Sequence, residues 1–225
     1  MPNGSGGRGP RTVALVGPYG SGKTTLLESI LFATGATQRK GTIAQKNTVG
    51  DAGAEARARQ MSVDLNPATV EYLGEKFTFL DCPGSIEFLQ DTLFALAGAD
   101  VVVVVAEPEA AKVQMLRPYL KRLADMGIPH LMFVNKVDKA SGSVEDLLGL
   151  LQGASDKPLI LRQVPTVMNG IVTGFVDLAL ERAFVYREHA ASEVVEISDK
   201  DNEKHARFAM LEKLADYDDA LMEEL

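Results

Sequence analysis

Hydrophobic and polar positions alternate in two recurring patterns between residues 12 and 152. Short apolar runs rich in β-branched residues are followed by longer segments in which apolar residues recur at helical spacing. The run Val101–Val105 is apolar at every position, which is typical of a parallel strand covered on both faces. We therefore expect a parallel sheet covered by helices. The predicted strands are Thr12–Val16, Thr69–Leu73, Lys76–Leu80, Asp100–Ala106 and His130–Val134, and the predicted helices are Gly22–Ala33, Glu87–Ala97, Ala110–Met126 and Ser143–Gln152.

The pattern changes in two other parts of the chain. Residues 34–66 show no sustained periodicity, and a loop of that length inside a compact domain is usually functional or mobile. After Lys157 the pattern predicts antiparallel strands at Leu159–Val164, Gly170–Leu178 and Ala183–Tyr186, then one long helix over Glu203–Leu225. We expect a flexible leader at 1–10, a core domain at 11–155 and a small α+β subdomain at 156–225.

Composition and charge narrow the class of protein. The chain has 225 residues, 46% of them hydrophobic, and 23 Lys and Arg against 31 Asp and Glu give a net charge of −8. This acidic balance argues against broad nonspecific attraction to nucleic acid, although a basic patch could exist locally. We expect no direct sequence-specific binding of nucleic acid by this chain. No run approaches the roughly 20 apolar residues of a membrane span, and a single Cys excludes an internal disulfide. We expect a cytoplasmic monomer without a membrane partner.

A glycine-rich stretch follows the first predicted strand and opens the first predicted helix. It fits the pattern G-x-x-x-x-G-K-[ST], in which backbone N–H groups and the helix N-terminus bind phosphates. Lys23 is expected to bridge the β- and γ-phosphates, and Thr24 to offer its hydroxyl to Mg²⁺. The predicted nucleotide-binding residues here are Gly17, Pro18, Tyr19, Gly20, Ser21, Gly22, Lys23, Thr24 and Thr25.

A carboxylate and a glycine follow another predicted strand. Asp81 and Gly84 fit D-x-x-G, with Asp81 expected to hold Mg²⁺ through water and the Gly84 N–H expected to reach the γ-phosphate. Asp146 and Gly149 match the same short pattern, but Asp146 is expected in the middle of a helix. The context therefore favours Asp81.

Two further features concern the base and the metal ion. Asn135, Lys136 and Asp138 fit N-K-x-D at the end of a predicted strand. A carboxylate such as that of Asp138 can accept two hydrogen bonds from guanine that adenine cannot offer, and the Lys stem can pack on the base. The long loop should supply a hydroxyl for Mg²⁺, for which Ser62 is the first candidate and Thr48 the second.

In this order, the motifs resemble those of the translational GTPases, and the family that the chain resembles most is elongation factor G. The stretches Gly174–Leu178, Arg182–Tyr186 and Ala215–Glu223 resemble the subdomain inserted into that family's GTP-binding domain, so the likeness covers nearly everything from residue 11 to 225. The resemblance implies a P-loop NTPase fold with an α+β insert, GTP, GDP and Mg²⁺ as ligands, and action on the ribosome as part of a longer protein.

The sequence departs from the family pattern at several positions. The family has His after the glycine of Asp-x-Pro-Gly, where this chain has Ser85, and Pro18 and Gly20 replace its usual His and Asp. The family also closes the base pocket with a Ser-Ala turn after the insert, for which this chain offers only Gly153–Ser155, before a predicted strand. We therefore expect an excerpt of a divergent paralogue, with Lys23, Gly84 and Ser85 as catalytic residues and low intrinsic GTPase activity.

Two alternatives stay open. The chain could be a binding switch that holds GTP with negligible hydrolysis, because Ser85 is a short replacement for a water-positioning His. It could also be a P-loop ATP-dependent kinase or ATPase, a hypothesis that leaves Asn135–Asp138 without a purpose.

Overall fold

The structure is a computed structural model that describes residues 11–50, 58, 62–140, 142–188 and 190–224. The chain divides into two compact units, Met1–Asn135 and Lys136–Leu225. They are called here the N-terminal unit and the C-terminal unit. This division falls before the expected boundary at residue 155, and the exact extent of the insert subdomain stays a prediction.

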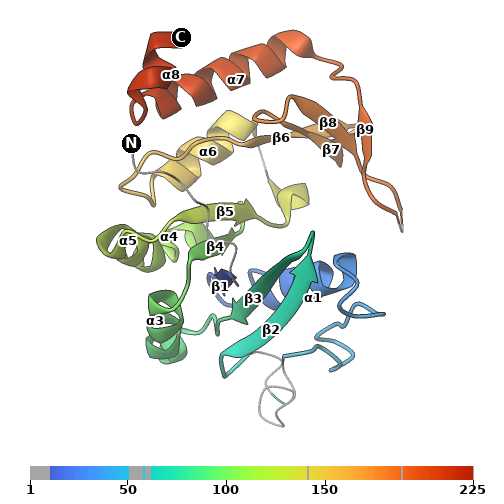
Figure 1. Ribbon diagram of the computed structural model, residues 1–225, viewed down its shortest axis with the longest axis vertical. Coiled ribbons are helices and arrows are strands. Elements are labelled where there is room, and N and C mark those ends of the chain that lie inside the picture. The colour runs from blue at the N-terminus through green and yellow to red at the C-terminus, as the bar shows by residue number, and fades with distance from the viewer. Residues whose placement is uncertain (1–10, 51–57, 59–61, 141, 189, 225) are drawn as a thin grey trace. The chain divides into compact units, whose positions relative to one another are not determined.

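The N-terminal unit is built on a five-stranded sheet with the order β2-β3-β1-β4-β5 (Figure 1). All neighbouring strands are parallel except the β2–β3 hairpin, which is antiparallel. The register pairs Leu15 with Asp81 and Ala106 with Val134, so the carboxyl ends of β1, β3, β4 and β5 meet at one edge. The strands are β1 (Arg11–Val16), β2 (Asn66–Tyr72), β3 (Glu75–Asp81), β4 (Val101–Ala106) and β5 (His130–Val134).

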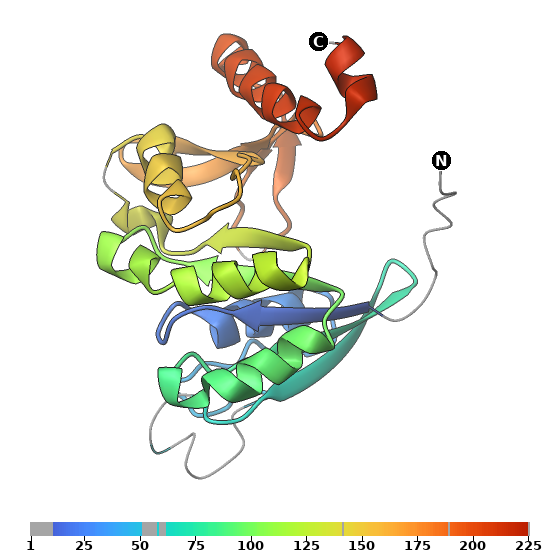
Figure 2. The same ribbon diagram turned by 90° about the vertical axis from the view of Figure 1, so that its left-hand side faces the viewer.

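Helices cover both faces of this sheet. Figure 2 shows α3 and α5 in front of β1, with α1 on the far side. The expected parallel sheet covered by helices is thus confirmed, and within the described residues of this sheet only β2 runs antiparallel to its neighbour. The helical elements of this unit are α1 (Lys23–Ala33), the short 3₁₀ helix η1 (Ile86–Phe88), α3 (Leu89–Ala97), α4 (Ala110–Gln114) and α5 (Arg117–Met126).

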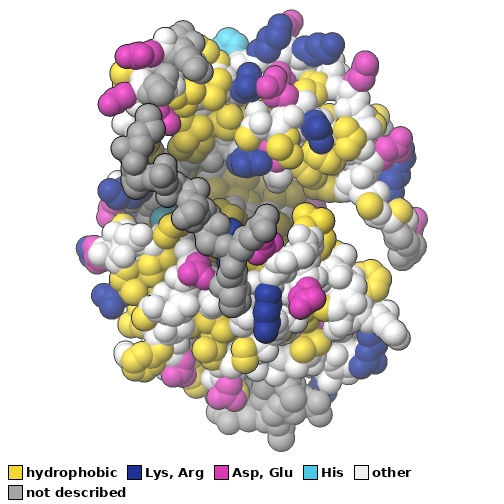
Figure 3. All heavy atoms as spheres, viewed as in Figure 1, with side chains coloured by type: hydrophobic (Ala, Val, Ile, Leu, Met, Phe, Trp, Pro, Cys, Tyr) yellow, Lys and Arg dark blue, Asp and Glu magenta, His cyan; other side chains and the backbone are white. Residues whose placement is uncertain are grey.

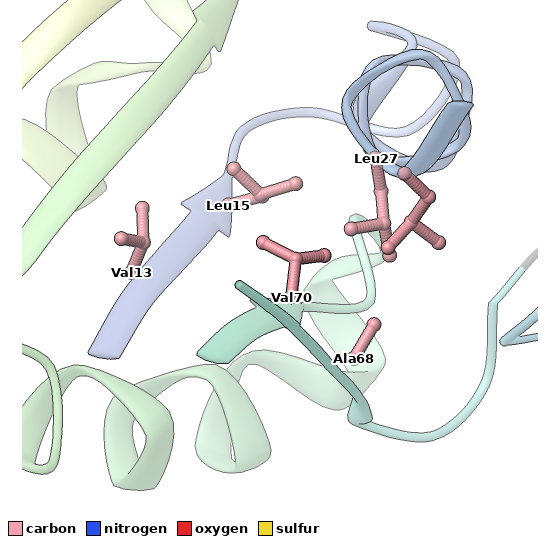
Figure 4. Packing of buried hydrophobic residues seen from close by; sticks show 6 residues of the cluster. Val13, Leu15, Leu27, Ala68 and Val70 are labelled. Atoms are coloured by element: carbon pink, nitrogen blue, oxygen red, sulfur yellow. The ribbon is translucent and has the colours of Figure 1, made fainter. Parts of the chain in front are cut away.

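The core beneath α1 explains why this helix is held firmly on the sheet. Leu27 and Leu31 are spaced one turn apart and point toward the strands, where they are 1% and 2% exposed. Figure 4 shows Leu27 facing Leu15 of β1, with Ala68 and Val70 of β2 beside them. The packing fixes the start of α1, and with it the glycine-rich loop that precedes the helix.

The single helix expected over Ala110–Met126 is wrong, since two helices occupy this range. Pro118 lies in the first turn of α5, where its missing N–H costs nothing. The chain leaves α4 through tight turns, with the N–H of Leu116 donating to the oxygen of Val113 at 3.0 Å. A proline in the middle of an apolar pattern therefore starts a new helix here.

The C-terminal unit contains a four-stranded antiparallel sheet with the order β6-β7-β8-β9. Its strands are β6 (Gln163–Met168), β7 (Ile171–Asp177), β8 (Arg182–Val185) and β9 (Glu193–Val195). The predictions for β7 and β8 hold to within a residue or two, and β9 was not expected. Phe175 and Phe184 stack across β7 and β8 with their ring centroids 4.9 Å apart, which supports this pairing.

The strand expected at Leu159–Val164 is wrong, because β6 begins only at Gln163. Asn169 and Gly170 adopt positive φ in the turn that joins β6 to β7, and this turn sets the register of the hairpin. The residues before β6 bond elsewhere: the N–H of Leu159 donates to Gln152 Oε1 at 2.8 Å. Turn chemistry thus overrides the apolar run.

The helices of this unit are α6 (Val144–Gln152), α7 (Lys200–Ala215) and α8 (Asp219–Glu224), together with the 3₁₀ helix η2 (Val137–Lys139). The one long helix expected at Glu203–Leu225 is wrong, because Asp218 begins a new helix by accepting from the N–H of Leu221 at 3.4 Å. Asp146 is also not in mid-helix. It stands in the first turn of α6 and accepts from the N–H of Ser143 at 2.9 Å, in a capping box.

Surface charge is mixed on the face shown in Figure 3. Lys and Arg side chains there are interspersed with Asp and Glu, and neither sign gathers into one field among the described residues. None of the helices in the described part of the chain combines the length and the apolar character that crossing a bilayer requires.

Candidate functional site

The glycine-rich loop lies directly between β1 and α1, and its backbone depends on three glycines. Gly17, Gly20 and Gly22 all have positive φ, at 144°, 76° and 99°. A Cβ on Gly17 would collide with the oxygen of Val105, and one on Gly22 would collide with Asn135 Nδ2. The loop therefore passes too close to neighbouring groups for any larger residue at these two positions. Pro18 and Ser21 are buried in the loop, whereas Tyr19 faces outward and is 53% exposed.

Lys23, the first residue of α1, is a buried cation at this loop. It is 6% exposed, and its Nζ donates to the oxygens of Gly17 at 2.9 Å and Pro18 at 3.1 Å. Burial lowers the pKa of the ammonium group, and the negative charge of Asp81 opposes that shift. A charge held by two loop carbonyls in a poorly solvated place is well suited to meet an incoming phosphate.

Three oxygen-bearing side chains converge beside Lys23. Thr24 Oγ1 donates to Asp81 Oδ2 at 2.6 Å and lies 3.2 Å from Ser62 Oγ. Thr24 and Asp81 are buried, at 7% and 0% exposed. The structure thus brings together the residues expected to bind a metal ion, and of the two loop hydroxyls it places Ser62, not Thr48, against Thr24.

Gly84 lies against the same loop. A Cβ there would collide with Lys23 Nζ and would be 2.8 Å from the nitrogen of Tyr19. Thr92 of α3 ties this segment down by donating to the oxygen of Pro83 at 3.3 Å. Ser85 follows, half-buried, and its oxygen accepts from the N–H of Phe88 at 3.1 Å. At Gly84 it is therefore the backbone that faces the glycine-rich loop.

Cys82 is a packed residue in this segment. It is 0% exposed, and burial raises the pKa of its thiol to about 12. The nearby charge of Asp81 acts in the same direction. The thiol is therefore protonated and unreactive at neutral pH.

Asn135, which follows β5, is hydrogen-bonded to the glycine-rich loop. Its Nδ2 donates to the oxygen of Ser21 at 2.8 Å, and its own N–H donates to the oxygen of Ala106 at 2.8 Å. Lys136 and Asp138 follow in the chain as part of the C-terminal unit, with Lys136 at a φ of 56° and Asp138 exposed. Asn135 thus stabilises the glycine-rich loop through this hydrogen bond, a role that the sequence pattern alone did not indicate.

Sequence reasoning also missed Glu28, a buried carboxylate on α1 that is 1% exposed. A signal was available, because Glu28 lies between the core residues Leu27 and Leu31 and one turn after Thr24. Thr25, by contrast, is exposed, and its oxygen accepts from Ser29 Oγ at 2.8 Å.

Comparison with known proteins identifies the family. Residues 9–219 match the family described as Elongation factor Tu GTP binding domain. The chain belongs to that family of translational GTPases. The expected fold class, a P-loop G domain with an insert subdomain, and the expected GTP-binding function are therefore confirmed.

Individual relatives agree. An elongation factor G-like protein of Synechocystis sp. is 46% identical over 217 residues, which are 96% of this chain and 32% of the relative. Elongation factor G 2 of Desulfotalea psychrophila is 26% identical over 225 residues, covering 95% of this chain and 32% of that protein. A crystal structure of a Thermus thermophilus protein superposes with a TM-score of 0.86 and 31% identity, over 97% of this chain and 33% of that one. The chain thus spans about a third of the length of these relatives.

Proposed function

We propose that this GTP-binding domain hydrolyses GTP to GDP and phosphate at a low intrinsic rate, and that the protein to which it belongs acts on the ribosome. The observation that carries the first part is the convergence of Lys23, Thr24, Asp81 and Gly84 on one glycine-rich loop. The proposal that the complete protein acts on the ribosome is supported by the names of its relatives, which are elongation factor G and elongation factor G-like proteins.

The chemistry proposed is an in-line attack of water on the γ-phosphate of GTP. Catalysis of this kind is almost entirely positioning and charge stabilisation. Lys23 supplies a buried positive charge for the phosphate oxygens, and the Gly84 N–H donates to the oxygens that gain negative charge. The loop amides from Tyr19 to Gly22, together with Lys23–Thr25 at the start of α1, hold the other phosphates.

The donor set beside Lys23 fits Mg²⁺. The hydroxyl of Thr24 lies within hydrogen-bond distance of both the Ser62 hydroxyl and the Asp81 carboxylate. Oxygen groups of these kinds are the ligands that Mg²⁺ prefers. Thr24 and Ser62 would bind directly and Asp81 through water. When bound, the ion neutralises charge on the β- and γ-phosphates.

The guanine base is proposed to bind at the residues that follow β5. Asn135 is tied to the loop through the oxygen of Ser21, and Asp138 comes only three residues later in the chain. Its exposed carboxylate can accept hydrogen bonds from the N1–H and 2-amino groups of guanine. Lys136 would pack its stem on the base.

Ser85 is the reason to propose a low rate. It follows Gly84 directly and is half-buried, but its hydroxyl is shorter than an imidazole and less basic. A group that orients or deprotonates water contributes about 10²–10⁴-fold to a rate. The same observation favours the second candidate, a GTP-binding switch without significant hydrolysis.

Single-turnover hydrolysis of GTP tests the proposal. The complete protein and its Ser85→His variant should be measured with and without ribosomes, with Glu71→Gln, at an exposed residue of β2, as the control. We expect slow hydrolysis by the wild type, stimulation by ribosomes, and a rate at least about tenfold higher in Ser85→His.

An unchanged rate in Ser85→His would contradict the role given to Ser85. Wild-type hydrolysis that is indistinguishable from buffer even with ribosomes would favour the switch. Hydrolysis that ribosomes leave unaltered would count against the ribosome as the partner.

A further inference from the structure

Glu28 is a carboxylate buried on the helix that carries Lys23 and Thr24. Its side chain is 1% exposed, and both oxygens accept from backbone groups of the loop after α1. The N–H of Gly41 donates to Oε2 at 2.8 Å, and the N–H of Val49 donates to Oε1 at 2.5 Å. Burying a carboxylate is costly unless it is hydrogen-bonded. The N–H groups of Gly41 and Val49 therefore offset the cost of burying the carboxylate of Glu28.

The segment between the two donors, residues 41–49, is folded on itself and is called here the 41–49 turn. The N–H of Thr42 donates to Asn47 Oδ1 at 2.7 Å, and the N–H of Lys46 donates to the oxygen of Ile43 at 3.0 Å. A Cβ on Gly41 would lie 2.7 Å from Glu28 Oε2 and 2.7 Å from the oxygen of Asn47. Only glycine allows the turn to sit this close to the carboxylate.

The same face of α1 also holds the far end of the loop. Thr24 and Glu28 are one helical turn apart, which puts their side chains in one row. Thr24 Oγ1 lies 3.2 Å from Ser62 Oγ, while Glu28 binds Gly41 and Val49. One helix face therefore contacts both flanks of the loop.

We infer that Glu28 is a positioning residue, which fixes the 41–49 turn to the phosphate-binding helix and so limits how far Ser62 can move from Thr24. A loop that is already held to the helix at residues 41 and 49 loses less entropy when Ser62 is ordered. Ser62 then meets the γ-phosphate side of GTP at a smaller cost. The inference rests on the proposed function, because it assigns Ser62 to the site that binds GTP.

GTP and GDP should therefore depend differently on Glu28. GDP lacks the γ-phosphate, so its affinity does not draw on loop contacts there. A residue that merely stabilised α1 would affect both nucleotides equally. The ratio of the two affinities separates a positioning role from a structural one.

The test compares Glu28→Gln with Glu71→Gln, an exposed glutamate on β2, in the complete protein. Hydrogen exchange of the peptide over residues 41–49 should be about tenfold faster in Glu28→Gln. The affinity for a non-hydrolysable GTP analogue should fall about tenfold and that for GDP by less than about twofold. Glu28→Asp, which keeps the charge, should recover part of both effects.

Unchanged exchange over residues 41–49 in Glu28→Gln would overturn the inference. Faster exchange with an equal loss of GDP and of the GTP analogue would also overturn it, since that result describes a structural residue. If the wild-type protein binds neither nucleotide, the proposed function itself is contradicted. The wild-type affinities are measured first, so this result is distinguished from a failure of the inference about Glu28.

Discussion

At the scale of single residues, Lys23 shows how the fold holds a buried positive charge in place beside the glycine-rich loop. The ammonium group is buried, it is held by the oxygens of Gly17 and Pro18, and it lies near Asp81. Burial lowers its pKa and the carboxylate limits that decrease. A phosphate that replaces the carbonyls would favour the charged form, so the affinity for nucleotide should be linked to the proton on Lys23.

This linkage predicts a pH dependence with a definite sign. The attraction is fully present below the lowered pKa of Lys23 in the free protein and is lost as the pH rises through it. GDP affinity should therefore fall as the pH rises, as followed by fluorescence titration. Lys23→Arg, whose guanidinium stays charged, should bind more weakly but with a flatter profile. Identical profiles would contradict the account, because titration of GDP itself is common to both proteins.

Asp138 carries the prediction about the base. Asp138→Asn should weaken GDP at least about tenfold and improve xanthosine diphosphate, since the amide offers a donor to the keto group at position 2. Asp125→Asn, at an exposed aspartate of α5, serves as the matched control. Calorimetric affinities check both nucleotides, and an unchanged affinity of Asp138→Asn for GDP would remove Asp138 from the base site.

At the scale of elements, the sequence predicts a helix or strand well where neighbouring residues all favour it, and poorly where a turn, a cap or a distant contact decides. The strand, glycine loop and helix from Arg11 to Ala33 were predictable because apolar periodicity and the glycines agree. The ends of β6 and of α7 were not, because the Asn169–Gly170 turn and the cap at Asp218 override apolar runs. The contacts of Glu28 with Gly41 and Val49 could not be predicted, since no periodicity spans a loop of that kind.

The packing of α1 on the sheet gives a stability prediction. Leu27→Ala removes a side chain that is 1% exposed between β1 and β2 and should lower the free energy of unfolding by about 2–5 kcal/mol. Phe32→Ala, at a residue of the same helix that is 51% exposed, should cost much less. Urea unfolding monitored by circular dichroism measures both, and equal losses would mean that α1 does not pack as described.

At the scale of the whole molecule, the family and the site agree on a guanine nucleotide. The match to the elongation factor Tu GTP-binding domain covers residues 9–219, and the described parts of that range contain the phosphate loop, Asp81, Gly84 and Asn135. The chain spans about a third of its relatives, so action on the ribosome belongs to the proposal for the complete protein.

The measurement that tests the central claim most directly is a calorimetric titration with GDP and, separately, with ADP in the presence of Mg²⁺. In the proposed site the glycine-rich loop would bind the phosphates of both nucleotides, whereas Asp138 would distinguish guanine from adenine. The account predicts binding of GDP at least about a hundredfold tighter than that of ADP. Equal affinities, or a preference for ADP, would contradict it and would favour an ATP-dependent enzyme instead.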